Sequence, residues 1–200
     1  MNRYATIVAD PPWPYKAPAK YGNTLEHRPN RDKTIAKEGA GSVVRYGAMS
    51  IRDICDIPVS ELAEGNAHLY LWTTNQFLVE AHQVAAAWGF RQSTVITWVK
   101  VRHADGQPSM KMGYYYRSAT EHCLFCVRGK RRLLGPARAT AFMAPREPHS
   151  QKPESFFDMV EEQSPERYLE LFARRRRLGW DVWGDQAPGA IDLSETLVAN

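Results

Sequence analysis

The sequence has few cysteines and no long hydrophobic run, and both absences exclude whole classes of protein. Only Cys55, Cys123 and Cys126 occur in 200 residues, so a disulfide framework is not expected and a reducing cytoplasm is the expected location. No apolar segment approaches the roughly 18 residues that a membrane span needs, and residues 1–10 lack the apolar stretch of a signal peptide. A secreted miniprotein and a membrane protein are therefore not expected.

Glycine-rich phosphate-binding motifs are also missing. The chain contains neither a Gly-x-Gly-x-x-Gly turn nor a Walker A sequence, the usual signatures of dinucleotide-binding and nucleotide-hydrolysing folds. What it does contain, 44% hydrophobic residues, 24% charged residues and six tryptophans, is typical of a folded domain. Its length is enough for one domain with a sizeable core.

Basic residues are gathered into two segments of a chain whose net charge is +4. One segment spans residues 128–138 and the other is the run of four arginines at 174–177. Such clusters attract polyanions, nucleic acid first. A solvated surface would have the same composition, so the charge alone leaves both interpretations open.

Short apolar runs alternate with helical patterns along the chain. Strands are expected at residues 6–9, 67–73, 94–99, 121–127, 167–172 and 180–183, and helices at 51–55, 59–63, 75–88 with Asn75 as its cap, and from Pro153 through Val160. This alternation predicts an α/β fold with a largely parallel sheet. Ligands of such sheets bind beyond the carboxyl ends of the strands, which places the expected site near Asp10, Thr74, Asn75, Lys100 and residues 172–174.

Two segments have no periodic pattern. Residues 14–49 carry prolines, glycines and charges, and a loop of this length is usually functional or disordered, so it is expected to be a mobile active-site or substrate loop. Residues 187–200 are expected to form a C-terminal tail.

The first expected strand ends in Asp10-Pro11-Pro12-Trp13, and these residue types suit one kind of chemistry. An ionised Asp presents only hydrogen-bond acceptors, and the prolines fix the backbone and leave carbonyls without a competing N–H. Such acceptors would hold both hydrogens of an exocyclic amino group, aim its lone pair at an electrophile and stabilise the charge that develops on nitrogen. Trp13 would stack on the base. A proline-rich strand exit with a capping Asp is the structural alternative.

The motifs that follow this tetrapeptide resemble, in kind and in order, those of the MT-A (70 kDa) family of N6-adenine methyltransferases. The resemblance covers about residues 5 to 186 and is far more specific than the tetrapeptide. Its motifs are residues 7–13, Tyr46-Gly47-Ala48-Met49-Ser50, residues 69–75, Trp88-Gly89-Phe90, Trp98-Val99-Lys100, residues 113–124, Ser150-Gln151-Lys152-Pro153-Glu154, Glu170-Leu171-Phe172-Ala173-Arg174 and Trp183-Gly184-Asp185-Gln186.

The resemblance implies a Rossmann-like methyltransferase fold, a mostly parallel seven-stranded sheet flanked by helices, with the catalytic motif first and the cofactor strand near the C-terminus. It implies S-adenosylmethionine as cofactor, with Lys152 near the methionine carboxylate. The implied cofactor-binding residues are Asp10, Lys152, Glu170, Phe172, Arg174, Asp185 and Gln186. The implied substrate-binding residues are Tyr46, Trp72, Asn75, Arg117, Glu121 and Ser150. Asp185 stands where the family usually has Asn. No metal site is expected, since Cys123 and Cys126 share one strand and lack a second pair of ligands.

These observations predict one methyltransferase domain over residues 1–186, acting on the N6 amino group of adenine in nucleic acid, DNA rather than RNA. Asp10, Pro11, Pro12 and Trp13 are the expected catalytic residues, in a direct in-line displacement without a covalent intermediate. An RNA adenosine methyltransferase and a non-catalytic nucleic-acid-binding subunit are the alternatives. A cytosine N4 enzyme is chemically possible, but Asp in the first position resembles the adenine enzymes more. A homodimer or a partner subunit is a possible assembly.

Overall fold

The computed structural model describes residues 3–15, 48–110, 115–147, 151–184, 187 and 189–191. They form one seven-stranded sheet in the order β5-β3-β4-β2-β1-β6-β7. The strands are β1 (Tyr4–Ala9), β2 (Ala63–Thr73), β3 (Arg91–Val101), β4 (Thr120–Arg128), β5 (Ala141–Pro145), β6 (Tyr168–Leu171) and β7 (Trp180–Trp183). The helices are α1 (Ile51–Cys55), α2 (Val59–Leu62), the 3₁₀ helix η1 (Asn75–Phe77), α3 (Leu78–Ala87) and α4 (Glu154–Gln163).

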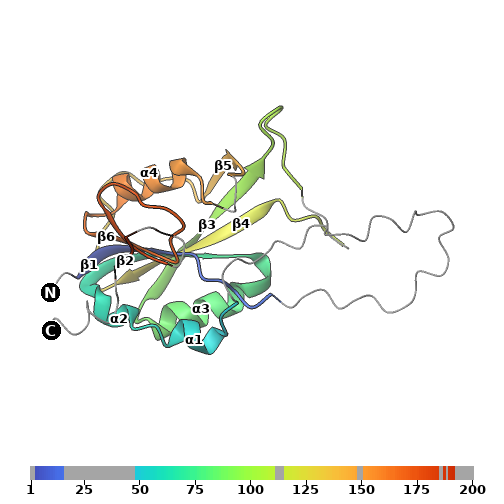
Figure 1. Ribbon diagram of the computed structural model, residues 1–200. Helices are drawn as coiled ribbons and strands as arrows, with labels where there is room; N and C mark the ends of the chain where they lie inside the picture. The colour runs from blue at the N-terminus through green and yellow to red at the C-terminus, as the bar shows by residue number, and fades with distance from the viewer. Residues whose placement is uncertain are drawn as a thin grey trace, which may run out of the picture.

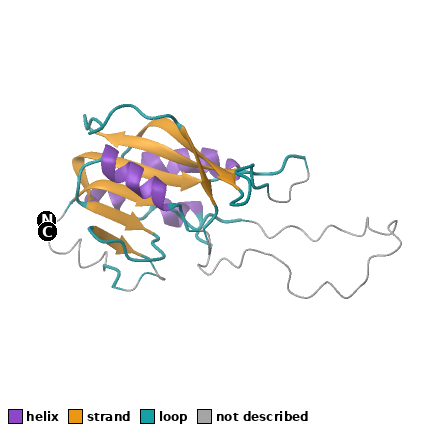
Figure 2. Ribbon diagram, turned by 90° about the horizontal axis from the view of Figure 1, so that it is seen from above, coloured by secondary structure: helices purple, strands orange, loops and turns teal. Residues whose placement is uncertain are grey.

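The sheet lies between two helical layers, with α1, α2 and α3 on one face and α4 on the other (Figures 1 and 2). Only β4 is antiparallel to its neighbours β2 and β3, whereas the pairs β1–β2, β1–β6, β6–β7 and β3–β5 are parallel. The expected fold class, a mostly parallel seven-stranded α/β sheet flanked by helices, is confirmed. No helix in the described part of the chain is long and apolar enough to cross a membrane.

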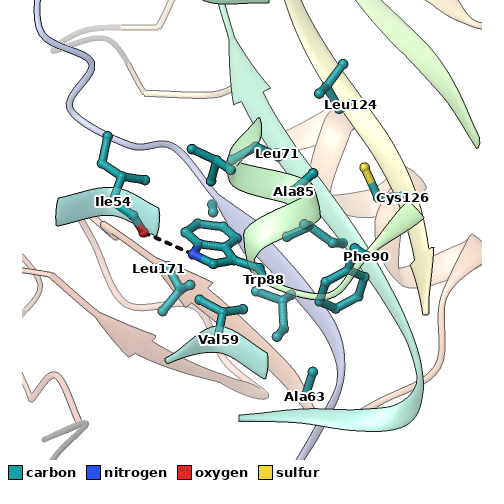
Figure 3. Close-up of a cluster of buried hydrophobic side chains, with 14 of the residues drawn as sticks. Ile54, Val59, Ala63, Leu71, Ala85, Trp88, Phe90, Leu124, Cys126 and Leu171 are labelled. Carbon is teal, nitrogen blue, oxygen red and sulfur yellow. Dashed lines mark hydrogen bonds between the residues drawn. The ribbon is translucent and has the colours of Figure 1, made fainter. Parts of the chain in front are cut away.

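Alternation along the central strands divides the core between the two faces. Ile7, Leu69 and Leu71 point toward α1 to α3, whereas Val8 and Tyr70 point toward α4. Trp88 anchors the first layer, because its buried indole donates to the carbonyl oxygen of Ile54 at 3.0 Å (Figure 3). Burial of both faces explains why these strands are continuous apolar runs in the sequence.

Two parts of the expected secondary structure need correction. β5 was not predicted, because it has only five residues and ends in a proline, and the periodicity of so short an apolar run does not distinguish a strand from a helix. Asn75 does not cap the following helix, since it is the first residue of η1 and the cap position is held by Thr74.

Several polar side chains gather where the parallel strands of the sheet end, which we call this edge of the sheet. The parallel strands β1, β2 and β6 end there, followed by Asp10, Thr74 and Phe172. Because β4 runs the other way, it begins at this edge and brings Glu121 beside the ends of its neighbours. The segment before α4 brings Lys152 to the same place.

Candidate active site

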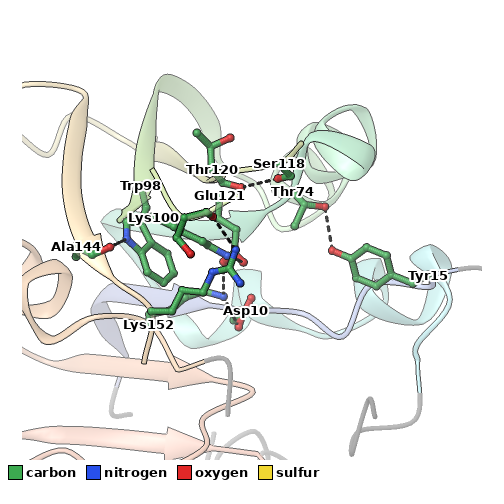
Figure 4. Close-up of polar contacts among 12 residues, drawn as sticks. Asp10, Tyr15, Thr74, Trp98, Lys100, Ser118, Thr120, Glu121, Ala144 and Lys152 are labelled. Atoms are coloured by element: carbon green, nitrogen blue, oxygen red, sulfur yellow. Dashed lines mark hydrogen bonds and ion pairs between the residues drawn. The ribbon is translucent and has the colours of Figure 1, made fainter. Parts of the chain in front are cut away.

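Four charged side chains alternate in sign across this edge of the sheet. The Lys152 ammonium donates to Asp10 Oδ2 at 2.7 Å and lies 3.2 Å from Glu121 Oε2. The other carboxylate oxygen of Glu121, Oε1, pairs with the ammonium of Lys100 (Figure 4). The order Lys100–Glu121–Lys152–Asp10 therefore links β3, β4, the start of α4 and the end of β1.

Burial makes these contacts stronger than surface ion pairs. The side chains of Lys100 and Lys152 are 6% and 10% exposed, whereas Asp10 is 25% exposed and faces the cleft. Burial alone would raise the pKa of Glu121, but Lys152 and Lys100 outweigh it and hold that pKa at about 2. Burial alone would lower the pKa of Lys152, yet Asp10 and Glu121 raise it. Both Glu121 and Lys152 therefore favour the charged state.

The turn after β1 is fixed by its own backbone. The Pro11 carbonyl accepts from the Trp13 N–H at 2.9 Å, and the Pro12 carbonyl accepts from the Met49 N–H at 3.0 Å. Each carbonyl oxygen has a second lone pair for a ligand hydrogen. The turn therefore holds its two carbonyls rigidly beside Asp10.

Trp13 has a different place from the one expected. It is 3% exposed, stacks on Phe77 at 5.6 Å between ring centroids, and donates its indole N–H to the Trp72 carbonyl at 3.1 Å. A buried ring stacked on a neighbour offers no free face to an adenine. Its position corrects the expected stacking role, and Trp13 instead fastens the turn at residues 10–13 to the end of β2.

A cleft lies beside Asp10 and Lys152. Its lining includes Asp10, Trp72, Lys152, Glu170, Phe172 and Arg174. Phe172 follows β6 with a φ of 63°, a left-handed conformation that is costly for a bulky residue and typical of functional turns. Burial raises the pKa of Glu170 to about 7, so its carboxyl is poised to gain or lose a proton near neutrality.

A second small cluster lies on the other face of the same edge. His122 donates from Nε2 to Asn75 Oδ1, because an amide oxygen only accepts. Its Nδ1 then accepts from the Thr97 hydroxyl at 3.1 Å. Burial lowers the pKa of His122, which favours this neutral form. The exposed amide of Asn75 is thereby held in one orientation at the end of β2.

The comparison with known families agrees with this arrangement. The sequence model of MT-A70 matches residues 4–186, which include every element of the sheet. The chain belongs to the MT-A70 family. This confirms the resemblance inferred from the motifs and the enzyme class that it implies, an adenine N6-methyltransferase.

Individual relatives differ greatly in length. This MT-A70 chain is 28% identical to the type II methyltransferase M.MunI of Mycoplasma sp over 195 residues, which cover 94% of the chain and 79% of M.MunI. It is 24% identical to METTL3 of Homo sapiens, an N(6)-adenosine-methyltransferase catalytic subunit, across its whole length but only 31% of METTL3. It is 28% identical to MTA1 of Cryphonectria parasitica, an N6-methyladenosine RNA methyltransferase, over 90% of the chain and 50% of MTA1. The chain thus spans half or less of these two longer relatives.

The structure brings most of the expected site residues of this MT-A70 domain to one edge. Asp10, Trp72, Lys152, Glu170, Phe172 and Arg174 line the cleft, and Glu121 touches Lys152. Arg117 is exposed beside the start of β4. Tyr46, Ser150, Asp185 and Gln186 lie outside the described residues, so their roles stay predictions. Within the described ranges, no group of three or more His, Cys, Asp or Glu side chains is placed to hold a metal ion.

Lys100 is the site residue that sequence reasoning did not assign a role. Its position at the end of an expected strand placed it at the right edge, and it belongs to the Trp98-Val99-Lys100 motif. The missing signal is its pairing, since only the register of β3 against β4 brings it to Glu121. A buried lysine with a carboxylate partner is visible in the structure alone.

Proposed function

We propose that this MT-A70 domain transfers a methyl group from S-adenosylmethionine to the N6 amino group of adenine in DNA. The observation that carries the proposal is the Asp10 carboxylate, held by Lys152 at the mouth of the cleft and followed by two rigid proline carbonyls. This arrangement places acceptors for an amino group beside a cavity that suits a charged small molecule.

The lining of the cleft fits the chemistry of S-adenosylmethionine. Lys152 offers an ammonium to a carboxylate, Phe172 an aromatic surface, and Glu170 and Arg174 polar groups to ribose hydroxyls. Asp185 and Gln186 are proposed to complete the ribose and adenine contacts. When bound, the cofactor supplies a methyl group on a sulfonium, an electrophile that needs no metal and no covalent enzyme intermediate.

The chain's own residues would act on the amino group. Asp10 Oδ2 is engaged by Lys152, so Asp10 Oδ1 and a carbonyl of Pro11 or Pro12 are the acceptors for the two amino hydrogens. Holding both hydrogens directs the nitrogen lone pair toward the cleft, and most of the rate would come from this near-attack geometry. The carboxylate also stabilises the positive charge that develops on nitrogen.

The target adenine must leave the base stack to reach Asp10. Unstacking costs a few kcal/mol, which contacts outside the described residues and at Asn75, Glu121 and Arg117 are proposed to offset. DNA is the proposed substrate because this chain covers 79% of M.MunI, which is named a type II methyltransferase. METTL3 and MTA1, which are named for adenosine or RNA, are covered only to 31% and 50%. A cytoplasmic location and a second subunit belong to the same proposal.

The catalytic role is tested by Asp10→Ala. Methyl transfer to DNA oligonucleotides should fall below detection, while calorimetry should still detect S-adenosylmethionine binding, because Lys152 keeps Glu121 as a partner. Wild-type turnover in this variant would refute the role of Asp10.

The substrate is tested by methylating matched DNA and RNA oligonucleotides, digesting them to nucleosides and weighing the products. N6-methyldeoxyadenosine is the expected product. Methylated RNA alone would make the RNA enzyme the correct reading, since a 2′-hydroxyl contact is what distinguishes the two at one site. Absence of both products, together with no cofactor binding, would identify a non-catalytic subunit.

A further inference from the structure

We propose that Lys100 is a positioning residue for methyl transfer, which acts through Glu121 to keep Lys152 on Asp10. The inference rests on the proposed function and adds a residue to its machinery. Lys100 is not among the residues that line the cleft, so its effect on the reaction must pass through a neighbour.

The sheet register makes the contact specific. Trp98 of β3 pairs with Glu121 of β4, and Lys100 lies two residues further along the same face of β3. Side chains two residues apart on a strand share a face, so the Lys100 ammonium reaches diagonally across to Glu121 Oε1. The carboxylate thereby has one oxygen for each lysine, with Oε2 toward Lys152.

Two contacts stabilise the Lys100 ammonium, whose side chain is only 6% exposed. Its ammonium lies 4.7 Å from the centroid of the Trp98 ring, a cation–π contact. The Trp98 ring is itself fixed, because its indole N–H donates to the Ala144 carbonyl at 2.8 Å. β5 therefore holds Trp98, and Trp98 with Glu121 holds Lys100.

A second lysine lies over a tryptophan ring on β2, on the other side of β4. The Lys152 ammonium lies 5.0 Å from the centroid of the Trp72 ring, and Trp72 meets Trp98 edge to face at 6.2 Å. Two ammonium groups thus face two carboxylates, Asp10 and Glu121, and the four charges sum to zero. Among the described residues, Tyr15 and the neutral His122 ring also lie near enough to Glu121 to interact with its charge.

Loss of Lys100 would upset this balance at the reacting end. Glu121 would then have only Lys152 as a cation, and one ammonium would be shared by two carboxylates in a poorly solvated place. Glu121 would compete more strongly for Lys152, because a largely buried carboxylate that has lost one of its two cations is costly. Asp10 would lose the contact that orients its carboxylate toward the amino group.

A double-mutant cycle tests the path of the effect. Lys100→Met should lower the single-turnover rate of methyl transfer about tenfold or more, whereas Lys100→Arg should retain most of it. In a Glu121→Gln background the Lys100→Met change should have little further effect, because the two act as one unit. Arg91→Met, an exposed change at the opposite end of β3, is the matched control and should leave the rate unchanged.

Each outcome decides the matter. A wild-type rate for Lys100→Met, or a loss that simply multiplies the loss of Glu121→Gln, would overturn the inference. Circular dichroism and thermal unfolding of the same variants separate a folding defect from a positioning defect. If Lys100→Met does not fold but Lys100→Arg does, the rate of Lys100→Gln decides. A wild-type rate for Lys100→Gln would then also overturn the inference. Failure of the unmodified protein to bind S-adenosylmethionine or to methylate adenine would instead refute the proposed function.

Discussion

Glu170 is the acidic residue of the cleft whose charge is least compensated. Burial raises its pKa to about 7, and Arg177 and Lys152 only partly offset this. In the unfolded chain a Glu loses its proton near pH 4.3, so between about pH 4.5 and 7 the folded state binds more protons. Stability contributed by the protonated carboxyl is therefore lost as the pH rises through this window.

Glu170→Gln should remove that loss. The variant should be more stable than the wild type at pH 8 by about 1 to 3 kcal/mol, with little difference at pH 4.5, as measured by urea unfolding across the range. Glu166→Gln, an exposed change in the segment just before β6, is the control and should show neither effect. An identical pH slope in Glu170→Gln and wild type would show that Glu170 ionises normally.

The role of Trp13 can be tested by comparing the stability of a variant with its affinity for the oligonucleotide. Trp13→Phe removes the indole donor from the Trp72 carbonyl but keeps a ring against Phe77, and should cost about 1 to 2 kcal/mol of unfolding free energy. If Trp13 fastens the turn at residues 10–13, the rate of methyl transfer should fall together with the stability of the protein. Unchanged stability with a raised KM for the oligonucleotide would instead restore the stacking role.

At the scale of secondary structure, the short helix α1 is linked by a backbone hydrogen bond to the turn at residues 10–13. Ser50 and Asp53 form a capping box at its first turn, and the preceding Met49 N–H donates to the Pro12 carbonyl. Ser50→Ala should cost about 1 kcal/mol of unfolding free energy, since this cap satisfies an otherwise free N–H. Ser50→Asp should keep the stability, and a neutral Ser50→Ala would show that tertiary contacts alone hold α1.

The elements that could be predicted from sequence are strands with two buried faces and elements whose ends are marked by residues such as proline. The central strands were found because most residues of β1, β4, β6 and the second half of β2 are apolar, and α4 was found because Pro153 precedes an apolar pattern. β5 was missed because a run of five apolar residues that ends in a proline has no clear strand period. The start of β2 at Ala63 was also missed, since Glu64, Gly65 and Asn66 are polar or flexible, and the pairing of Ala63 with Tyr4 of β1 is a tertiary contact.

The site was predictable as a set of residues but not as a set of contacts. Motif order located Asp10, Lys152 and Glu121, whose meeting depends on three separate elements. Sequence cannot show that β4 runs antiparallel, and that single reversal brings Glu121 to the cleft and Lys100 to Glu121. The burial of Trp13 against Phe77 depends on packing in the same way.

Across the whole molecule, the two basic segments lie at opposite ends of the sheet. Residues 174–177 follow β6 at the cleft, whereas residues 128–138 follow the end of β4, which meets the beginnings of β2 and β3. Much of their charge is used internally, since Arg131 pairs with Glu64, Arg138 with Glu162, and Arg175 and Arg177 with Glu154. The basic composition therefore overstates the surface available to phosphates.

This placement predicts a weak salt dependence for short substrates. Each phosphate contact lowers log K by about 0.7 to 0.9 per unit of log salt, so with the segment at 128–138 facing away, a short oligonucleotide should show a slope of only about 2 to 4. The double variant Lys130→Ala with Arg132→Ala should leave both the slope and KM unchanged, because these side chains lie at the far end of the sheet from Asp10. A slope reduced by about two in that variant would mean that the nucleic acid wraps from the cleft around the sheet to its opposite edge, and that the domain holds its substrate across a much longer path than the site alone requires.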